Sequence, residues 1–414
     1  MNQTGTVELQ WLERGLFEAL MASGRRLLGD LLTAIAPREI PAAHRRHREK
    51  RYRRKRTLVT VLGPVEFVRD YYHCPECSRI PFDAELGILN RRYSPGVRRM
   101  MGYAASQGCY RAAARDLREL AGLHIPARSI QKEVLATAGV LARVLDKLES
   151  PDSGAIPLLY IGLDGTGAPM RRDALQGRRG RQPDGSARTR EVKLACVFTQ
   201  HGTDAEGLPC RDPNSTSYVA NFKSASDFGA DVLAEARRRG LARSVRRVVL
   251  GDGAVWIWEL ARANFPDACQ ILDYYHASEH VHEAHRALFA GEAPDILEQW
   301  KGWLWDGRVD HIIQAIESLV EAEPDPDTAR DMASHKTYFE NNRQRMRYAE
   351  FRKEGYFIGS GVVEAGCKTV VCQRLKQSGM FWSVKGAEAI LTYRSAVLND
   401  RYDAAWTKNS TMVA

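Results

Sequence analysis

Three apolar segments that each lead into an aspartate constrain the fold of this chain more than any other feature. They read IPLLYIGLDG (156–165), RRVVLGDG (246–253) and CQILD (269–273), and their acidic residues are Asp164, Asp252 and Asp273. Short apolar runs of this kind predict buried strands. A carboxylate is costly to bury, so one that ends a core strand either shapes a turn or belongs to a site. Because sites in open α/β sheets form beyond the carboxyl ends of strands, the repetition predicts a site at one sheet edge.

A third carboxylate of the candidate site lies far along the chain. Strand and helix patterns alternate between about 155 and 275, and residues 277–352 then read as helical throughout. Gly359-Ser360-Gly361 opens a further helix, and Glu364 lies in its first turn, where the helix dipole by itself favours a carboxylate. Asp164, Asp252 and Glu364 thus form a D…D…E set in a βα frame. Such hard oxygen ligands suit Mg²⁺ or Mn²⁺ ions that stabilise both oxygens of an in-line displacement at phosphorus.

The chain is long enough for several domains, and its patterns predict seven segments. Two helices in the third segment are spaced as a helix-turn-helix, whose second helix would enter a DNA major groove, and an ordinary helical hairpin is the alternative. The segments are an N-terminal helix (1–40), a basic run with a zinc-ribbon-like β-hairpin turning at Gly63-Pro64 (41–93), a helical DNA-binding domain (94–152), the first part of an α/β core (153–276), a helical insertion (277–352), the Glu364 helix (353–400) and a tail (401–414).

Positive charge is concentrated in one short stretch. The chain has a net charge of +9, and HRRHREKRYRRKR (44–56) contains nine Arg or Lys and one Glu, which gives +8. Charge gathered in this way predicts contacts with nucleic-acid phosphates, and the alternative is a solvated charged segment. The predicted DNA-binding residues are Arg45, Arg46, Arg48, Arg51, Arg53, Arg54, Lys55 and Arg56, together with Lys368, Arg374 and Lys376 after Glu364.

A zinc site is a further prediction. Cys74-x-x-Cys77 follows the expected hairpin with the spacing of two zinc ligands, but four ligands are needed. His44 and His47 carry the same spacing upstream of the hairpin, so a structural Zn²⁺ held by two histidines and two cysteines is one interpretation. A metal-free hairpin is the other.

Several motifs together resemble one known family. DGTGAPM (164–170), GDGAVWIW (251–258), ILDYYHASEH (271–280) and GYFIGSGVVEAGCKTVVCQRLKQSGMFW (355–382) are similar to the ISKra-type transposases of bacterial insertion sequences. That resemblance implies an RNase H-like mixed-sheet catalytic core, related to Mutator-like transposases, with Asp164, Asp252 and Glu364 as the DDE triad. The chain departs from the family in carrying His44 and His47 where relatives have a first CxxC.

The same resemblance bears on Asp273 and His276. Asp273-x-x-His276 resembles the (C/D)xxH signature that follows the second aspartate of Mutator-like transposases. An auxiliary role in DNA handling and a purely structural hydrogen-bonded pair are both open for these two residues. His280, His282 and His285 follow closely, match no metal motif by spacing, and are expected on a surface or DNA-facing helix.

These observations predict a metal-dependent DNA transposase. Water would cleave a phosphodiester at the end of the element, and the freed 3′-hydroxyl would attack target DNA without a covalent enzyme intermediate. The partners would be double-stranded DNA, namely terminal inverted repeats and target, and further copies of the chain in a homodimer or higher oligomer. Two other classes stay open, a non-catalytic DNA-binding regulator derived from a transposase and a stand-alone metal-dependent nuclease. Lacking a signal-peptide pattern and a disulfide framework, the chain is expected in the cytoplasm, at the nucleoid.

Overall fold

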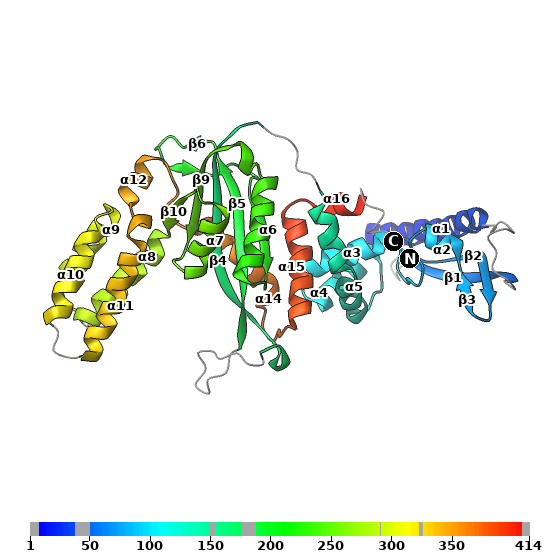
Figure 1. Ribbon diagram of the computed structural model, residues 1–414. Helices are drawn as coiled ribbons and strands as arrows, with labels where there is room; N and C mark the ends of the chain where they lie inside the picture. The colour runs from blue at the N-terminus through cyan, green and yellow to red at the C-terminus, as the bar shows by residue number, and fades with distance from the viewer. Residues whose placement is uncertain are drawn as a thin grey trace. The chain divides into compact units, whose positions relative to one another are not determined.

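The computed structural model describes residues 8–37, 50–148, 154–175, 188–289, 291–322 and 326–407. They form two units, the first made of Met1–Leu148 with Thr392–Ala414 and the second of Glu149–Leu391 (Figure 1). A mixed five-stranded sheet and many helices confirm the predicted mixed α/β class. None of the described helices combines the length and the apolar character needed to cross a bilayer.

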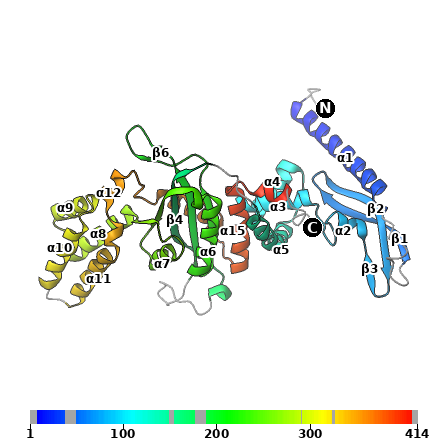
Figure 2. The ribbon, with the colours of Figure 1, turned by 45° about the horizontal axis from the view of Figure 1, so that its top comes forward.

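The first unit starts with a helix on a hairpin. Helix α1 (Leu9–Ile35) packs its second half on a sheet of strands β1 (Lys50–Thr60), β2 (Gly63–Cys74) and β3 (Cys77–Arg79), as Figure 2 shows. Thr60 pairs with Gly63, so the hairpin turns at Val61-Leu62 and the expected turn at Gly63-Pro64 is wrong. The described part of the basic run lies within β1, because every residue from Lys50 to Thr60 pairs with β2.

The rest of the first unit is helical. Ser94 accepts a hydrogen bond from the backbone N–H of Val97 and so caps α3, while Gly122 ends α4 in the left-handed conformation. The Tyr393 hydroxyl lies 2.6 Å from Thr137 Oγ1 and joins the chain's return segment to this bundle. The helices are α2 (Pro81–Glu85), α3 (Pro95–Gln107), α4 (Tyr110–Ala121), α5 (Ala127–Asp146), α16 (Tyr402–Thr407) and the end of α15 (Val384–Leu398), inside which the boundary between the units falls.

The second unit is built on one sheet with the strand order β10-β9-β4-β5-β8. Strands β10, β9 and β4 run parallel, and β5 and β8 complete the sheet by antiparallel pairing. Successive residues are buried at 158–163 in β4, 248–251 in β9 and 271–272 in β10, so these parts of the sheet are buried on both faces, which explains the continuous apolar runs. The bounds are β4 (Ile156–Pro169), β5 (Thr189–Gln200), β8 (Ser217–Asn221), β9 (Ser244–Gly251) and β10 (Cys269–Leu272), with a small ribbon of β6 (Gly202–Thr203) and β7 (Pro209–Cys210) beside them.

Helices cover both faces of this sheet. A Cβ on Gly251 would meet Ile257 of α7 (Val255–Asn264), whereas a Cβ on Gly162 would meet Val363 of α13 (Gly361–Gly366). Gly251 pairs with Leu163, the next residue after Gly162, and successive strand residues point to opposite faces. Helices α7 and α13 therefore lie on opposite faces, and α6 (Ala225–Arg238) packs against α7.

A group of helices separates β10 from α13. Its interior is apolar, with Trp300, Leu304, Ile312 and Phe339 fully or almost fully buried. This is the segment for which the sequence predicts a helical insertion. Its helices are α8 (Tyr274–Phe289), α9 (Pro294–Trp305), α10 (Val309–Ala322), α11 (Pro326–Asn342) and α12 (Tyr348–Lys353).

Candidate functional site

The three aspartates that follow the apolar runs lie at one edge of the parallel part of the sheet. Leu163 of β4, Gly251 of β9 and Leu272 of β10 pair with one another in a single row, and Asp164, Asp252 and Asp273 are the residues that follow them. The sequence suggested that this strand ends at Asp164, but β4 continues beyond it. Its parallel pairing with β9 stops at Leu163, but its antiparallel pairing with β5 continues to Pro169.

Glycine lets the helix that carries Glu364 approach this edge closely. A Cβ on Gly162 would lie 2.2 Å from Cγ2 of Val363, so no larger residue fits there without displacing α13. Gly162 and Asp164 point to the same face of β4, because strand side chains alternate. Asp164 therefore faces the side of the sheet on which α13 and Glu364 lie.

A cysteine connects the helix with the first aspartate. The thiol of Cys367, three residues after Glu364, donates to Asp164 Oδ2 at 3.1 Å, and the backbone N–H of Gly165 donates to Oδ1 at 2.6 Å. Burial raises the pKa of Asp164 and the nearby charge of Asp252 raises it further, against the opposing effect of the two hydrogen bonds. The helix changes to π-helical winding at Cys367–Cys372 and continues as α14 (Gln373–Leu375). Such π-turns occur often at functional sites.

Asp252 is held by the turn that follows β9. Its Oδ1 accepts a hydrogen bond from the backbone N–H of Ala254 at 3.0 Å, and Gly253 takes a φ of +103° that other residues rarely adopt. Asp252 is half-buried. One carboxylate oxygen thus fixes the turn.

Asp273 is the centre of a buried hydrogen-bond network. Its Oδ1 accepts from the backbone N–H of His276 at 2.8 Å and lies 3.2 Å from Nδ1 of that ring, and its Oδ2 accepts from the backbone N–H of Ser360. Burial opposes ionisation, yet these bonds hold the pKa of Asp273 below its usual value. The bond with Asp273 raises the pKa of His276 to about 9, so the imidazole is cationic at neutral pH. The Ser360 hydroxyl lies 3.3 Å from Glu364 Oε1 and links this network to the Glu364 helix.

The donor chemistry of this edge fits a hard divalent cation. Asp164, Asp252 and Glu364 offer carboxylate oxygens, and a cation would offset the repulsion and burial that raise the pKa of Asp164. Within the described part of the chain, the one set of three His, Cys, Asp or Glu ligand atoms within 4.8 Å of one another is His280, Glu283 and His335. The carboxylate oxygens of Asp164, Asp252 and Glu364 therefore do not all lie within 4.8 Å of one another. A centre that holds two metal ions about 4 Å apart has its ligands spread more widely than a site for a single ion.

The predicted DNA-binding residues have unequal environments. Arg45, Arg46 and Arg48 lie outside the described residues, and Arg53, Arg54 and Lys55 are exposed on β1. Arg51 bonds Asp70 at 2.8 Å. Arg56 is nearly buried in an ion pair with Asp83 and also donates to the carbonyls of Ile88 and Arg91.

Among the cations after Glu364, two are exposed and one is not. Lys368 is exposed, and exposed Lys376 donates to Thr166 Oγ1 at 2.6 Å, next to the sheet edge. Arg374 is fully buried over the ring of Trp382, so it packs the core of the unit and does not face solvent. The periodicity of the sequence did not distinguish these three side chains.

The predicted zinc ligands are described only in part. Cys74 and Cys77 pair across β2 and β3, and Cys74 is buried. His44 and His47 lie outside the described residues. Zinc binding by this hairpin therefore stays a prediction.

Sequence reasoning missed Cys367 and Ser360 as neighbours of the site. The sequence marks Cys367 only as a small apolar residue, and its hydrogen bond with Asp164 spans 203 positions. His285, expected on the surface, is buried and lies 3.0 Å from the carbonyl oxygen of Ala293, so that expectation is wrong.

Known proteins match this chain over almost its whole length. A family model described as "Uncharacterised protein family (UPF0236)" matches residues 3–409. One UPF0236 protein of Caldanaerobacter subterraneus subsp. tengcongensis, whose name joins eleven loci, is 21% identical over 374 residues, which cover 87% of this chain and 72% of the relative. A second from the same organism, whose name joins four loci, has the same identity and coverage. Among solved structures, the Drosophila P element transposase strand transfer complex matches with a TM-score of 0.34 and 10% identity, over 76% of this chain and 92% of that one.

Proposed function

The chain belongs to the uncharacterised protein family UPF0236, and from this premise we propose that it is a DNA transposase of the ISKra type with a DDE mechanism on an RNase H-like core. One observation carries the proposal. The paired row of Leu163, Gly251 and Leu272 brings Asp164 and Asp252 to the same sheet edge, and the glycine at 162 brings the Glu364 helix onto the adjoining face. Carboxylates gathered at one place can hold the metal ions that metal-assisted phosphoryl transfer uses.

The names of the relatives support a mobile element. One curated relative stands for eleven loci and another for four loci of the same bacterium. Multiplication of one gene within one genome is expected of an insertion sequence, because each round of transposition can leave a new copy.

The residues divide the work as follows. Asp164, Asp252 and Glu364 would hold Mg²⁺ or Mn²⁺, which when bound neutralises charge on the phosphate under attack and on both reacting oxygens. Ser360 and Cys367 would position the carboxylates of Glu364 and Asp164 through their hydrogen bonds. His276, cationic at neutral pH, would add a positive charge near Asp252 for the DNA backbone. We also propose that a homodimer or larger assembly acts on the two element ends.

Two other functions give different results in the same experiments. A DNA-binding regulator derived from a transposase would bind element ends without cutting them. A stand-alone nuclease would cut but would not join the freed 3′-hydroxyl to a target. The DNA that flanks the gene supplies the substrate, since short inverted repeats bracketed by direct repeats would define the ends. Cleavage and joining of duplexes made from these ends then separate the three functions.

Metal removal is the first test of the mechanism. Cleavage of an end-containing duplex should require Mg²⁺ or Mn²⁺ and stop with EDTA, because carboxylates alone cannot stabilise the charge that develops at phosphorus. A gel assay with readdition of excess Mg²⁺ measures this and controls for irreversible damage. Cutting that persists after complete chelation contradicts the proposed centre.

The exposed cations of β1 provide a test of DNA binding. Replacing Arg53, Arg54 and Lys55 by Gln should weaken binding to any duplex and reduce the slope of log K against log salt by about 0.9 for each phosphate that the protein no longer neutralises. Phosphate contacts of this kind set affinity without reading bases. Fluorescence anisotropy titrations at several salt concentrations measure the slope.

A matched variant controls for a general change in charge. It replaces three exposed arginines of the second unit by Gln, at Arg237, Arg308 and Arg330. An unchanged slope in the β1 variant, or an equally reduced slope in both variants, would assign the basic strand to a different role.

A further inference from the structure

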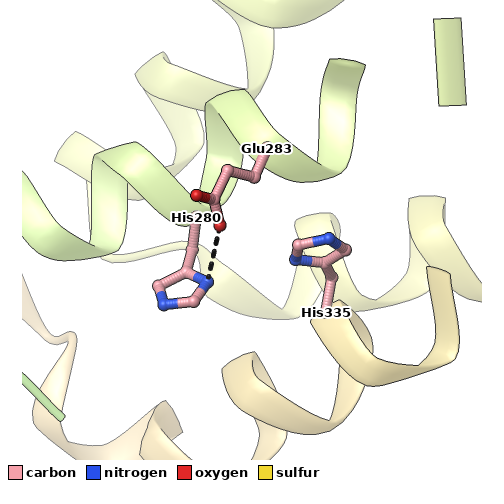
Figure 3. Close-up of side chains that lie close together, drawn as sticks. All are labelled: His280, Glu283 and His335. Atoms are coloured by element: carbon pink, nitrogen blue, oxygen red, sulfur yellow. Dashed lines mark ion pairs between the residues drawn. The ribbon is translucent and has the colours of Figure 1, made fainter. Parts of the chain in front are cut away.

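The helical insertion contains a cluster of potential metal ligands that the proposed function does not use. His280 and Glu283 lie on successive turns of α8, and His335 lies on α11. Their ligand atoms all lie within 4.8 Å of one another. Figure 3 shows the three side chains pointing toward one shared space from the two helices.

A ring nitrogen of His280 faces this space without a hydrogen-bond partner among the described residues. Its Nδ1 is buried and has no hydrogen bond with the described residues, and the nearest carboxylate oxygen, Oε2 of Glu283, is 3.6 Å away. Buried polar atoms are normally satisfied, so an orphaned ring nitrogen beside a carboxylate calls for a ligand. A separation of 3.6 Å is too long for a hydrogen bond but close to the distance between two ligands on one tetrahedral ion, whose bonds are about 2.1 Å long.

The ring of Tyr338 packs against one member of the cluster. It stacks on His280 with a centroid distance of 3.6 Å and an interplanar angle of 27°. Its hydroxyl lies 3.3 Å from where a Cβ of Gly253 would stand, in the turn that holds Asp252. The cluster is thus joined to the candidate catalytic edge by one aromatic ring and by the helix that begins after Asp273.

We propose that His280, Glu283 and His335 bind one Zn²⁺ ion that fastens α8 to α11. Two imidazole nitrogens and one carboxylate oxygen form a donor set that favours zinc over magnesium, which prefers oxygen ligands alone. Because Glu283 is exposed, the fourth coordination position opens to solvent and takes water. This site is separate from the carboxylate triad, and its ligands differ from the cysteines and histidines of the N-terminal hairpin.

Zinc titration of the purified full-length protein tests the proposal. Competition with a chromogenic chelator should find one zinc equivalent per chain that disappears in His335→Ala and in Glu283→Gln. Since loss of even an outer partner of a ligand weakens metal binding 10- to 100-fold, loss of a ligand should weaken it by about a hundredfold or more. Glu283→Gln changes an exposed side chain and keeps the test valid if His335→Ala folds poorly. His282→Ala, at an exposed histidine on the same helix, is the matched control and should bind zinc as the wild type does.

Two further measurements identify the ligands. The difference between the cobalt spectra of the wild type and His335→Ala should contain visible ligand-field bands without the near-ultraviolet thiolate band that cysteine ligands produce, which distinguishes this site from the hairpin. Zinc at a hundredfold excess over its Kd should raise the Tm of the second unit by roughly 5–10 °C in the wild type and in His282→Ala only. Equal zinc binding in wild type, His335→Ala and Glu283→Gln would overturn the proposal, and so would an absence of zinc binding in the wild type. Neither outcome depends on DNA cleavage, so failure of the proposed transposase function is a separate result.

Discussion

Asp252→Asn is expected to abolish DNA cleavage and strand transfer while the protein still folds and binds DNA. Asparagine keeps the shape of the side chain and an oxygen that can accept the hydrogen bond from Ala254, so the turn after β9 should persist. The substitution removes a negative charge that a hard cation needs. Stabilisation by a catalytic metal is worth several kcal/mol, so a loss of about 4 kcal/mol would slow cleavage about a thousandfold.

The other two carboxylates should behave in the same way. Asp164→Asn and Glu364→Gln are each expected to lose cleavage, and double variants should be little worse than single ones, because the three residues act as a unit. Glu259→Gln, which neutralises an exposed carboxylate on α7, is the matched control and should cut normally. Cleavage gels are run beside binding titrations on the same preparations. A variant that binds DNA and cuts at nearly the wild-type rate removes its residue from the site.

Among the substitutions proposed here, Asp273→Ala should lower the free energy of unfolding the most. The carboxylate is fully buried and accepts hydrogen bonds from the backbone of His276, the His276 ring and the backbone of Ser360. Removing it leaves the Ser360 N–H buried without its acceptor and takes the counter-charge from His276. Charge-assisted bonds contribute about 1.5–3 kcal/mol each, and we expect a loss of about 3 kcal/mol for the network because His276 is partly exposed. In a unit of this size that lowers Tm by roughly 10 °C, measured by calorimetry.

The dependence of stability on pH identifies the ion pair. The pKa of His276 is raised to about 9, so its contribution is complete below the usual histidine pKa and disappears as pH rises through 9. The pKa of Asp273 is lowered, so its contribution is complete above the usual aspartate pKa and disappears as pH falls. Asp273→Asn should therefore remove the stability difference between about pH 6.5 and 9, and an NMR titration should find the His276 pKa well below 9. Asp267→Asn, at a largely exposed carboxylate before β10, should change neither quantity.

The acidic residues of the candidate site show which features of the fold could be predicted from the sequence. The apolar runs before Asp164, Asp252 and Asp273 predicted three neighbouring strands, and the first turn of the Glu364 helix was predicted correctly. These predictions rest on local properties, because strand burial and helix starts follow from the spacing of apolar residues and glycines. The same local logic gave the wrong hairpin turn at Gly63-Pro64, since cross-strand pairing moved the turn to Val61-Leu62.

The sequence by itself thus determined the strands, the helices and the kinds of side chain available for chemistry. The tertiary structure alone decided which of these side chains meet. Register aligns Leu163, Gly251 and Leu272, which sets three aspartates on one edge, and packing across 203 positions brings Cys367 to Asp164. Burial separates Arg374, inside the core, from exposed Lys368 and Lys376. The physical reason is that periodicity reports which face of its own element a residue occupies, whereas contacts between elements depend on register and close packing that sequence separation does not encode.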